Sequence, residues 1–342
     1  MVTANRTRQP GAHARGGVAM DHALTSNLDR VVGWLNERRH APTAVSLLRA
    51  TVGLVSVAYY ATSWEDRRFL FGPDGLYGTD MMHDLVAARG AFSLYLVSGS
   101  MVWFEVVFHV GCLLAVLVML GIGGRLTLSL HGAFIWSLYM TNPTLMDGGD
   151  NLVILVIPFL LLTRCFDRVT VRPSRRHRTD RTSSTIAHNT GVLLISVQLC
   201  IVCLLAGLYK VQGQLWQDGT ALYYILRVPE FFWPGITPLL FHAGWLLVIA
   251  AYATVLASVF FPALVLFRAG RPIAVSLMIV FHCGIALLMN LTSFALVMIA
   301  LDLIFDEARA ERIVLSASSS LRTAKRLVCR EGGWGRVPSP EL

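Results

Sequence analysis

Long apolar stretches recur along this chain of 342 residues, with short polar segments between them. An α-helix crosses the hydrocarbon core of a bilayer with about 17–25 mostly apolar residues. This criterion predicts spans at 43–63, 94–121, 125–141, 150–164, 190–211, 239–267, 272–289 and 291–306. The third, fourth and eighth are short, and the third and fourth could instead form a shallow hairpin. We therefore expect an all-α, polytopic transmembrane helical bundle of about eight spans.

Arginine is unevenly distributed between the polar segments. It is abundant before the first predicted span, between the fourth and fifth, and after the last. The alternate loops hold only Arg67, Arg68, Arg89 and Arg227. Because cytoplasmic loops of membrane proteins are enriched in Lys and Arg, this asymmetry predicts that both termini are cytoplasmic.

Composition supports the same class of protein. Hydrophobic residues make up 55% of the chain and charged residues 15%, against about 25% charged in soluble domains. The net charge of +8 has no basic stripe with interleaved aromatics, so we expect contact with an anionic leaflet and no nucleic-acid partner. We divide the chain into a disordered cytoplasmic tail (1–40, with a short amphipathic stretch at 28–35), a transmembrane domain (41–308) and a cytoplasmic C-terminal tail (309–342).

Lys210 is one of only two lysines; the other is Lys325 in the C-terminal tail. Lys210 ends the apolar run 191–209, where an ionisable side chain is costly and is a candidate for function. Unlike arginine, a lysine can give up its proton and act as a base. Alternatively, Lys210 could simply extend its amine to the outer membrane interface.

Other polar residues in the apolar segments also have two interpretations. His282 could be a satisfied core histidine or a catalytic one. Glu105 and His109 share a helix face at i, i+4, as a structural pair or a proton relay. Asp147 and Asp150 precede the fourth span, where they could cap the helix or border an anion site.

Aromatic residues and cysteines have conventional interpretations. Trp216, Tyr223 and Tyr224 fit an interfacial aromatic belt. The six cysteines fall mostly in apolar segments, where they are expected to pack as small hydrophobic residues. No metal site is expected, because the histidines lack HExxH-like spacing.

Several short elements together resemble the HTTM family, whose membrane domain is shared with vitamin K-dependent gamma-carboxylase. The resemblance covers residues 43–306. Its elements are Ala-Gly-Leu-Tyr-Lys at 206–210, Trp216 with Asp-Gly-Thr-Ala-Leu-Tyr-Tyr at 218–224, Asn142-Pro143 ahead of Asp-Gly-Gly-Asp-Asn at 147–151, Phe-His-Cys-Gly-Ile-Ala at 281–286 with Phe294, and Glu105.

The resemblance implies a chemistry. In the carboxylase a lysine amine deprotonates reduced vitamin K, oxygen adds, and the strong base that forms removes a proton from a glutamate γ-carbon, to which CO₂ then adds. The implied catalytic residues are Lys210, at the place of that lysine, with His282 and Glu105. The implied substrate or cofactor site comprises Asn142, Asp147, Asp150, Asn151, Trp216, Asp218, Thr220 and Tyr223.

The implied cofactor is reduced vitamin K or a menaquinol-type quinone, with O₂ and CO₂ as co-substrates and no metal. If active, the protein would be a carboxylase-like lyase. The expected partners are the lipid bilayer, the quinone and a secreted peptide or protein. The family's chemistry faces the lumen, which corresponds here to an outward-facing site in a multi-pass plasma-membrane protein.

The chain also departs from the carboxylase. Asp150 and Asn151 stand near a position where the carboxylase has a histidine, and Ser258 stands ahead of Phe261-Pro262 where many members have an acid. No counterpart of its large lumenal region is evident. HTTM proteins also resemble a membrane component that helps mature a sporulation-delaying peptide toxin. Two classes therefore stay open, a quinol-dependent enzyme and a non-catalytic maturation or export factor; a transporter is disfavoured because no internal repeat is visible.

Overall fold

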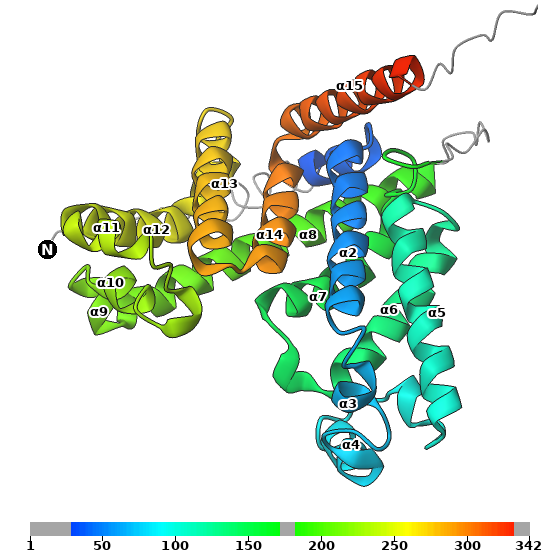
Figure 1. Ribbon diagram of the computed structural model, residues 1–342. Helices are drawn as coiled ribbons and strands as arrows, with labels where there is room; N and C mark the ends of the chain where they lie inside the picture. The colour runs from blue at the N-terminus through cyan, green and yellow to red at the C-terminus, as the bar shows by residue number, and fades with distance from the viewer. Residues whose placement is uncertain (1–28, 172–181, 332–342) are drawn as a thin grey trace, which may run out of the picture.

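The computed structural model describes residues 29–171 and 182–331, with side chains described as far as residue 320. The described residues form α-helices and short 3₁₀ turns and no β-strand, so the all-α prediction is confirmed. Figure 1 shows the helices packed side by side, with α8 running obliquely from the side of α5 and α6 to the side of α9 and α10.

Every predicted span corresponds to a helix. The helices are α2 (Pro42–Thr62), α5 (Met101–Leu120), α6 (Gly124–Thr141), α7 (Gly148–Leu162), α8 (Thr182–Gln212), α12 (Gly244–Leu266), α13 (Gly270–Met289) and α14 (Thr292–Asp302), which continues into η4 (Leu303–Phe305). Five of them, α2, α5, α8, α12 and α13, are long and apolar enough to cross a membrane, and α7 and α14 with η4 are shorter apolar helices. The chain is a membrane protein, and the count of eight spans stays a prediction.

Short helices fill two of the connections between the long ones, and a single 3₁₀ turn fills a third. The first holds α3 (Arg67–Phe71), α4 (Gly78–Ala88) and η1 (Leu94–Leu96), and η2 (Pro143–Leu145) lies between α6 and α7. The second holds α9 (Gln214–Gln217), α10 (Ala221–Ile225), η3 (Pro229–Phe231) and α11 (Thr237–His242). In Figure 1, α3 and α4 lie below α2, whereas α9 and α10 lie to the left of the bundle.

Glycines allow the closest helix contacts. A Cβ on Gly53 of α2 would lie 2.3 Å from the backbone nitrogen of Met119 in α5. A Cβ on Gly207 of α8 would lie 2.8 Å from the backbone nitrogen of Val259 in α12. Membrane helices associate largely through such close backbone packing, so these glycines fix how α2 meets α5 and how α8 meets α12.

A buried arginine joins three segments at one end of the bundle. Arg49 of α2 is fully buried and donates to the carbonyls of Val118 and Met119, at the C-terminal end of α5. It also donates to the carbonyls of Cys165 and Val169 in the α7–α8 connection. The C-terminal end of a helix carries partial negative charge, which favours a cation there. This guanidinium therefore holds α2, α5 and the start of the α7–α8 loop together.

The other arginine-rich segments gather at the same end. Glu307, at the start of α15 (Glu307–Glu331), accepts hydrogen bonds from the backbone nitrogens of Thr43 (2.7 Å) and Ala44 (2.9 Å), so it caps α2. Arg168 forms ion pairs with Glu307 and Glu311. Figure 1 shows α15 leaving this end and extending away from the bundle. The segments before α2, between α7 and α8, and at the start of α15 thus lie at one end of the bundle. This agrees with the predicted topology, in which an even number of membrane spans separates them.

Part of the predicted disordered tail is ordered. Residues 29–36 are helical. The amide of Asn189 donates to the carbonyls of Trp34, Leu35 and Arg38, which anchors this segment on α8. The prediction of disorder for 1–40 is therefore wrong for 29–40, because a distant side chain supplies the hydrogen bonds that the local sequence lacks. Residues 1–28, 172–181 and 332–342 lie outside the described part, and the C-terminal tail is helical to residue 331.

Candidate functional site

Lys210 lies in the last turn of α8. Its Nζ donates to the carbonyl of Ala206 at 3.3 Å and lies 5.5 Å from the ring centroid of Trp216. The side chain is partly buried. Among the side chains that the structure describes, no carboxylate forms an ion pair with this amine. The amine is thus held by one carbonyl and an indole face.

The two faces of α8 near Lys210 differ. Leu208 and Tyr209 are 41% and 72% exposed, so this face is open to the surrounding lipid. Cys203 and Gly207 are buried and face the interior of the bundle. Lys210 therefore lies between an exposed face of α8 and the interior of the bundle.

A buried pair lies deeper in the bundle. Nδ1 of His282 in α13 is 2.9 Å from Oδ2 of Asp302 in α14, and the two side chains are 1% and 0% exposed. The second carboxyl oxygen of Asp302 is buried without a hydrogen-bond partner. Asp302 was not predicted as a site residue; the available signal was a carboxylate within the predicted span 291–306.

Cys203 is a buried residue of α8 on the same face as Lys210. It lies seven residues before Lys210, two helical turns along the same face of α8. It is 2% exposed, and α8 packs against α14, the helix that carries Asp302. The inner face of α8 thus leads from the amine toward the His282–Asp302 pair.

The Asp-Gly-Gly-Asp-Asn element forms the start of α7. Asp147 accepts from the backbone nitrogen of Asp150 at 2.9 Å, and Asp150 accepts from that of Asp147 at 3.0 Å, which is a reciprocal capping box. The hydroxyl of Tyr139 also donates to Asp150 at 2.7 Å, and that of Ser293 donates to Asp147 at 2.5 Å. The capping interpretation of the two aspartates is confirmed.

The neighbouring asparagines have separate partners. Asn142 is buried, donates to the carbonyl of Leu70 at 3.1 Å and accepts from Thr144 at 2.6 Å. Asn151 is exposed and donates to the carbonyl of Asp147 at 2.9 Å. A cavity of about 360 Å³ borders Asp147 and Asp150, with Tyr59 and Ser293 also in its wall. Substrate binding by these residues stays a prediction.

Glu105 belongs to a different cluster. Arg67 contacts it at 3.0 Å, Arg68 at 2.5 Å, and His109 at 3.5 Å. In Figure 1, α5 and the end of α8 lie on opposite sides of the molecule. The structure therefore does not bring Glu105 to Lys210, and its immediate contacts are those of a structural ion cluster.

Of the four predicted site residues after α8, only Trp216 contacts Lys210. Asp218 is exposed and accepts from Gln214 at 3.0 Å. Thr220 donates to the carbonyl of Leu215 at 3.4 Å. The Tyr223 hydroxyl accepts from Arg227 at 2.9 Å, and its ring packs on Phe241.

These features define a membrane protein with a lysine beside an indole at the end of α8 and a buried histidine–carboxylate pair between α13 and α14. The HTTM domain family matches residues 91–309, which is more than half of the chain, and this protein belongs to that family. Sporulation-delaying protein SdpB of Bacillus subtilis (strain 168) is 26% identical over 230 residues, which cover 64% of this chain and 69% of the relative. No solved structure matches the chain.

Proposed function

We propose that this HTTM protein is a membrane-embedded enzyme in which the amine of Lys210 acts as a base toward a reduced quinone, in the modification of a secreted peptide. The observation that carries the proposal is the environment of Nζ. Its described contacts are one carbonyl and the Trp216 ring, with no carboxylate to hold the ammonium form. A general base needs an amine that is not locked in an ion pair.

The residues around Lys210 fit a quinone. The exposed side chains of Leu208 and Tyr209 open the site toward lipid, from which a lipid-soluble ring can arrive. Trp216 offers a flat aromatic surface beside the amine. A bound reduced quinone would supply an acidic hydroxyl group, with O₂ and CO₂ as co-substrates. Lys210 would accept the proton, and Trp216 would orient the ring.

The orientation of the site is part of the proposal. The arginine-rich segments gather at one end of the bundle, and Lys210 lies at the far end of α8 from them. By the positive-inside rule, Lys210 would then face the outside of the plasma membrane. A peptide substrate would meet the site there after export.

The test is oxygen uptake by the protein in nanodiscs with reduced vitamin K or menaquinol. Removing a general base slows catalysis by about 10²–10⁴-fold, so Lys210→Ala should lose turnover by that factor. Lys210→Arg should be equally inactive, because arginine keeps its proton. Lys325→Ala, at the other lysine, is the control and should retain activity. Turnover retained in Lys210→Ala would reject the lysine mechanism.

A second candidate is a non-catalytic membrane factor for maturation or export of a secreted peptide. The similarity to sporulation-delaying protein SdpB favours it. Asp150 and Asn151 stand where the carboxylase has a histidine, which is a further difference from that enzyme. An assay of peptide maturation in cells distinguishes the two candidates. If the protein is a non-catalytic factor, Lys210→Arg and Lys210→Ala should still support maturation. If it is the enzyme, neither variant should.

A further inference from the structure

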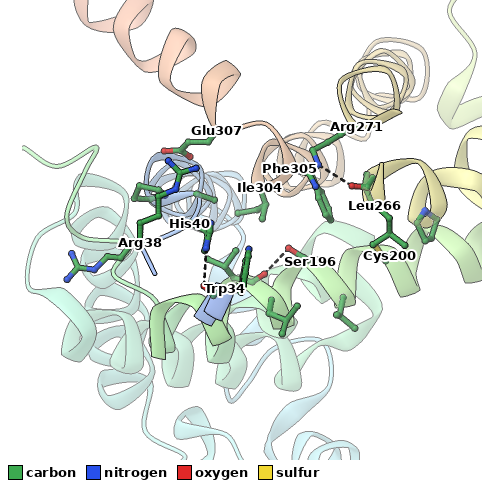
Figure 2. A pocket seen from close by; sticks show the side chains of 18 of the residues that line it. Trp34, Arg38, His40, Ser196, Cys200, Leu266, Arg271, Ile304, Phe305 and Glu307 are labelled. Carbon is green, nitrogen blue, oxygen red and sulfur yellow. Dashed lines mark hydrogen bonds between the residues drawn. The ribbon is translucent and has the colours of Figure 1, made fainter. Parts of the chain in front are cut away.

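A large cavity lies toward the arginine-rich end of the bundle. Its volume is about 940 Å³, and it is lined by α8, α12, the start of α13, η4, the start of α15, the segment before α2 and Arg168 of the α7–α8 connection. Figure 2 shows Trp34, His40 and Ser196 on one side of the space, and Arg271 with Phe305 and Leu266 on the other. On α8 its wall runs from Val192 to Leu204, which is about 9 Å of helix from Lys210, and Lys210 itself does not line it.

One part of the wall is apolar and belongs to candidate membrane helices. The α8 residues in it recur at helical spacing: Leu193, Val197, Ile201 and Leu204. Across the space lie Pro262, Val265 and Leu266 of α12, with Ile304 and Phe305 beyond them. Val197 and Ile201 are 48% and 45% exposed, although they lie on a helix long and apolar enough to span a membrane. This part of the wall suits a hydrocarbon chain.

The other part of the wall is cationic. Arg38, Arg39, Arg168 and Arg271 line it, together with Glu307 and Glu311. Both glutamates are engaged within the protein, by Arg168 and, for Glu307, also by the backbone of α2. Within the described residues, Arg38 and Arg271 have no carboxylate partner; the contact of Arg271 is with the carbonyl of Val265 at 3.1 Å. Two guanidinium groups thus remain to meet an anion at the rim of an apolar space.

We propose that this cavity binds an anionic phospholipid, with its headgroup at the arginine-lined rim and an acyl chain along α8 and α12. The cavity has both arginines and an apolar wall, which favours an amphiphile as its ligand. A small soluble anion would bind the arginines but would leave the apolar wall of α8 and α12 uncovered. Guanidinium groups pair with phosphate oxygens through two parallel hydrogen bonds. Trp34 and His40, stacked at 4.2 Å between ring centroids, form a flat wall at the headgroup level.

Native mass spectrometry of the detergent-purified full chain tests the proposal with phosphatidylglycerol and phosphatidylcholine. Phosphatidylglycerol should bind more tightly. Arg38→Gln and Arg271→Gln should each weaken it about fivefold, as each basic residue contributes about that factor near an anionic lipid. Arg268→Gln is the matched control, because Arg268 is exposed in the same α12–α13 turn and outside the cavity wall. It should bind phosphatidylglycerol as the wild type does.

Two further variants distinguish the contribution of the apolar wall from that of the positive charge. Ile201→Trp fills the apolar wall and should weaken both lipids, while Arg38→Lys keeps the charge and should retain most of the binding. Arg38 is exposed and its side chain has no hydrogen bond in the described structure, so its variants should fold even if those of Arg271 do not. Equal binding of the two lipids, an equal loss in Arg268→Gln, or full displacement of phosphatidylglycerol by inorganic phosphate would overturn the proposal.

Discussion

Asp302 illustrates what a single buried side chain contributes. It lies twenty residues after His282, and the two meet because α13 and α14 form a hairpin that turns at Asn290. Asn290 adopts a left-handed backbone conformation (φ 55°), which asparagine tolerates better than most residues. The histidine's partner is therefore set by the turn and by the packing of two helices. A buried carboxylate without that partner would be costly.

Replacing His282 should therefore destabilise the protein, because Asp302 would stay buried without its partner. His282→Leu leaves Asp302 buried without its hydrogen-bond donor, so the free energy of unfolding should fall by about 3 kcal/mol. The double variant His282→Leu/Asp302→Leu removes both polar groups and should be less destabilised than the single variant. Thermal unfolding in detergent measures both, with Cys283→Ala as the neighbouring control. A double variant as unstable as His282→Leu would show that the pair does not behave as a unit.

His40 should make stability depend on pH. Burial lowers the pKa of His40 below its usual 6.5, and the nearby Arg38 adds to this, while the hydrogen bond to the Trp34 carbonyl opposes it. The unfolded chain therefore takes up a proton near pH 6.5 and the folded chain only at lower pH. Stability should fall as the pH drops below about 6.5.

The matched variant for this effect is His40→Phe, which keeps a ring against Trp34 and cannot be protonated. Its melting temperature should fall less than that of the wild type between pH 7.5 and 5.5. Histidines away from His40 contribute equally to both proteins, so the difference between them reports on His40 and its neighbour His188. Parallel curves would exclude a role for its protonation.

At the scale of elements, the start of α7 is fixed by the start of α14. A Cβ on Gly149 would lie 2.7 Å from the backbone nitrogen of Phe294 and 2.9 Å from its Cα. The Phe294 ring also lies 6.0 Å from that of His282. Phe294 therefore contacts both the glycine-rich element at 147–151 and the Phe-His element at 281–286, which are more than a hundred residues apart in the chain.

Gly149→Ala should force α7 away from α14. Because the clash is with backbone, which cannot rotate away, we expect a loss of about 2 kcal/mol in the free energy of unfolding. Gly284→Ala is the control: a Cβ there meets nothing within 4 Å, and alanine should be neutral or slightly stabilising in a helix. Melting temperatures of the two variants test the contact. Equal stability would mean that the two helices do not pack this closely.

At the scale of the whole molecule, α8 sets the topology. It has 31 residues, about 46 Å of helix, which is longer than the hydrocarbon core of a bilayer. Its first residues lie at the arginine-rich end, where Asn189 holds the segment before α2, and its last turn carries Lys210. If α8 spans the membrane, its two ends must lie on opposite sides.

Cysteine labelling tests this arrangement. In a background without native cysteines, Gln217→Cys should react with an impermeant thiol reagent on intact cells. Ser183→Cys, near the other end of α8, should react only after lysis. Both residues are exposed in the structure, so access to the side chain does not limit the reaction. The opposite labelling pattern would invert the topology and place Lys210 in the cytoplasm.

The sequence by itself determined the membrane class, the places of the helices, the family and the prominence of Lys210. These properties depend on the length of apolar runs and on motifs of a few neighbouring residues, which are local. All eight predicted segments are helical, and the aspartates of the 147–151 element form the capping box that their spacing allowed. Capping, too, is decided within four residues of chain.

Only the tertiary structure decided which distant side chains meet. It paired His282 with Asp302, assigned Glu105 to Arg67 and Arg68, and ordered residues 29–40 on Asn189. It also formed a cationic, apolar cavity from segments that are far apart in the chain. A uniformly apolar helix carries little information about which face turns inward, so the partners of its few polar residues follow from helix packing rather than from sequence spacing.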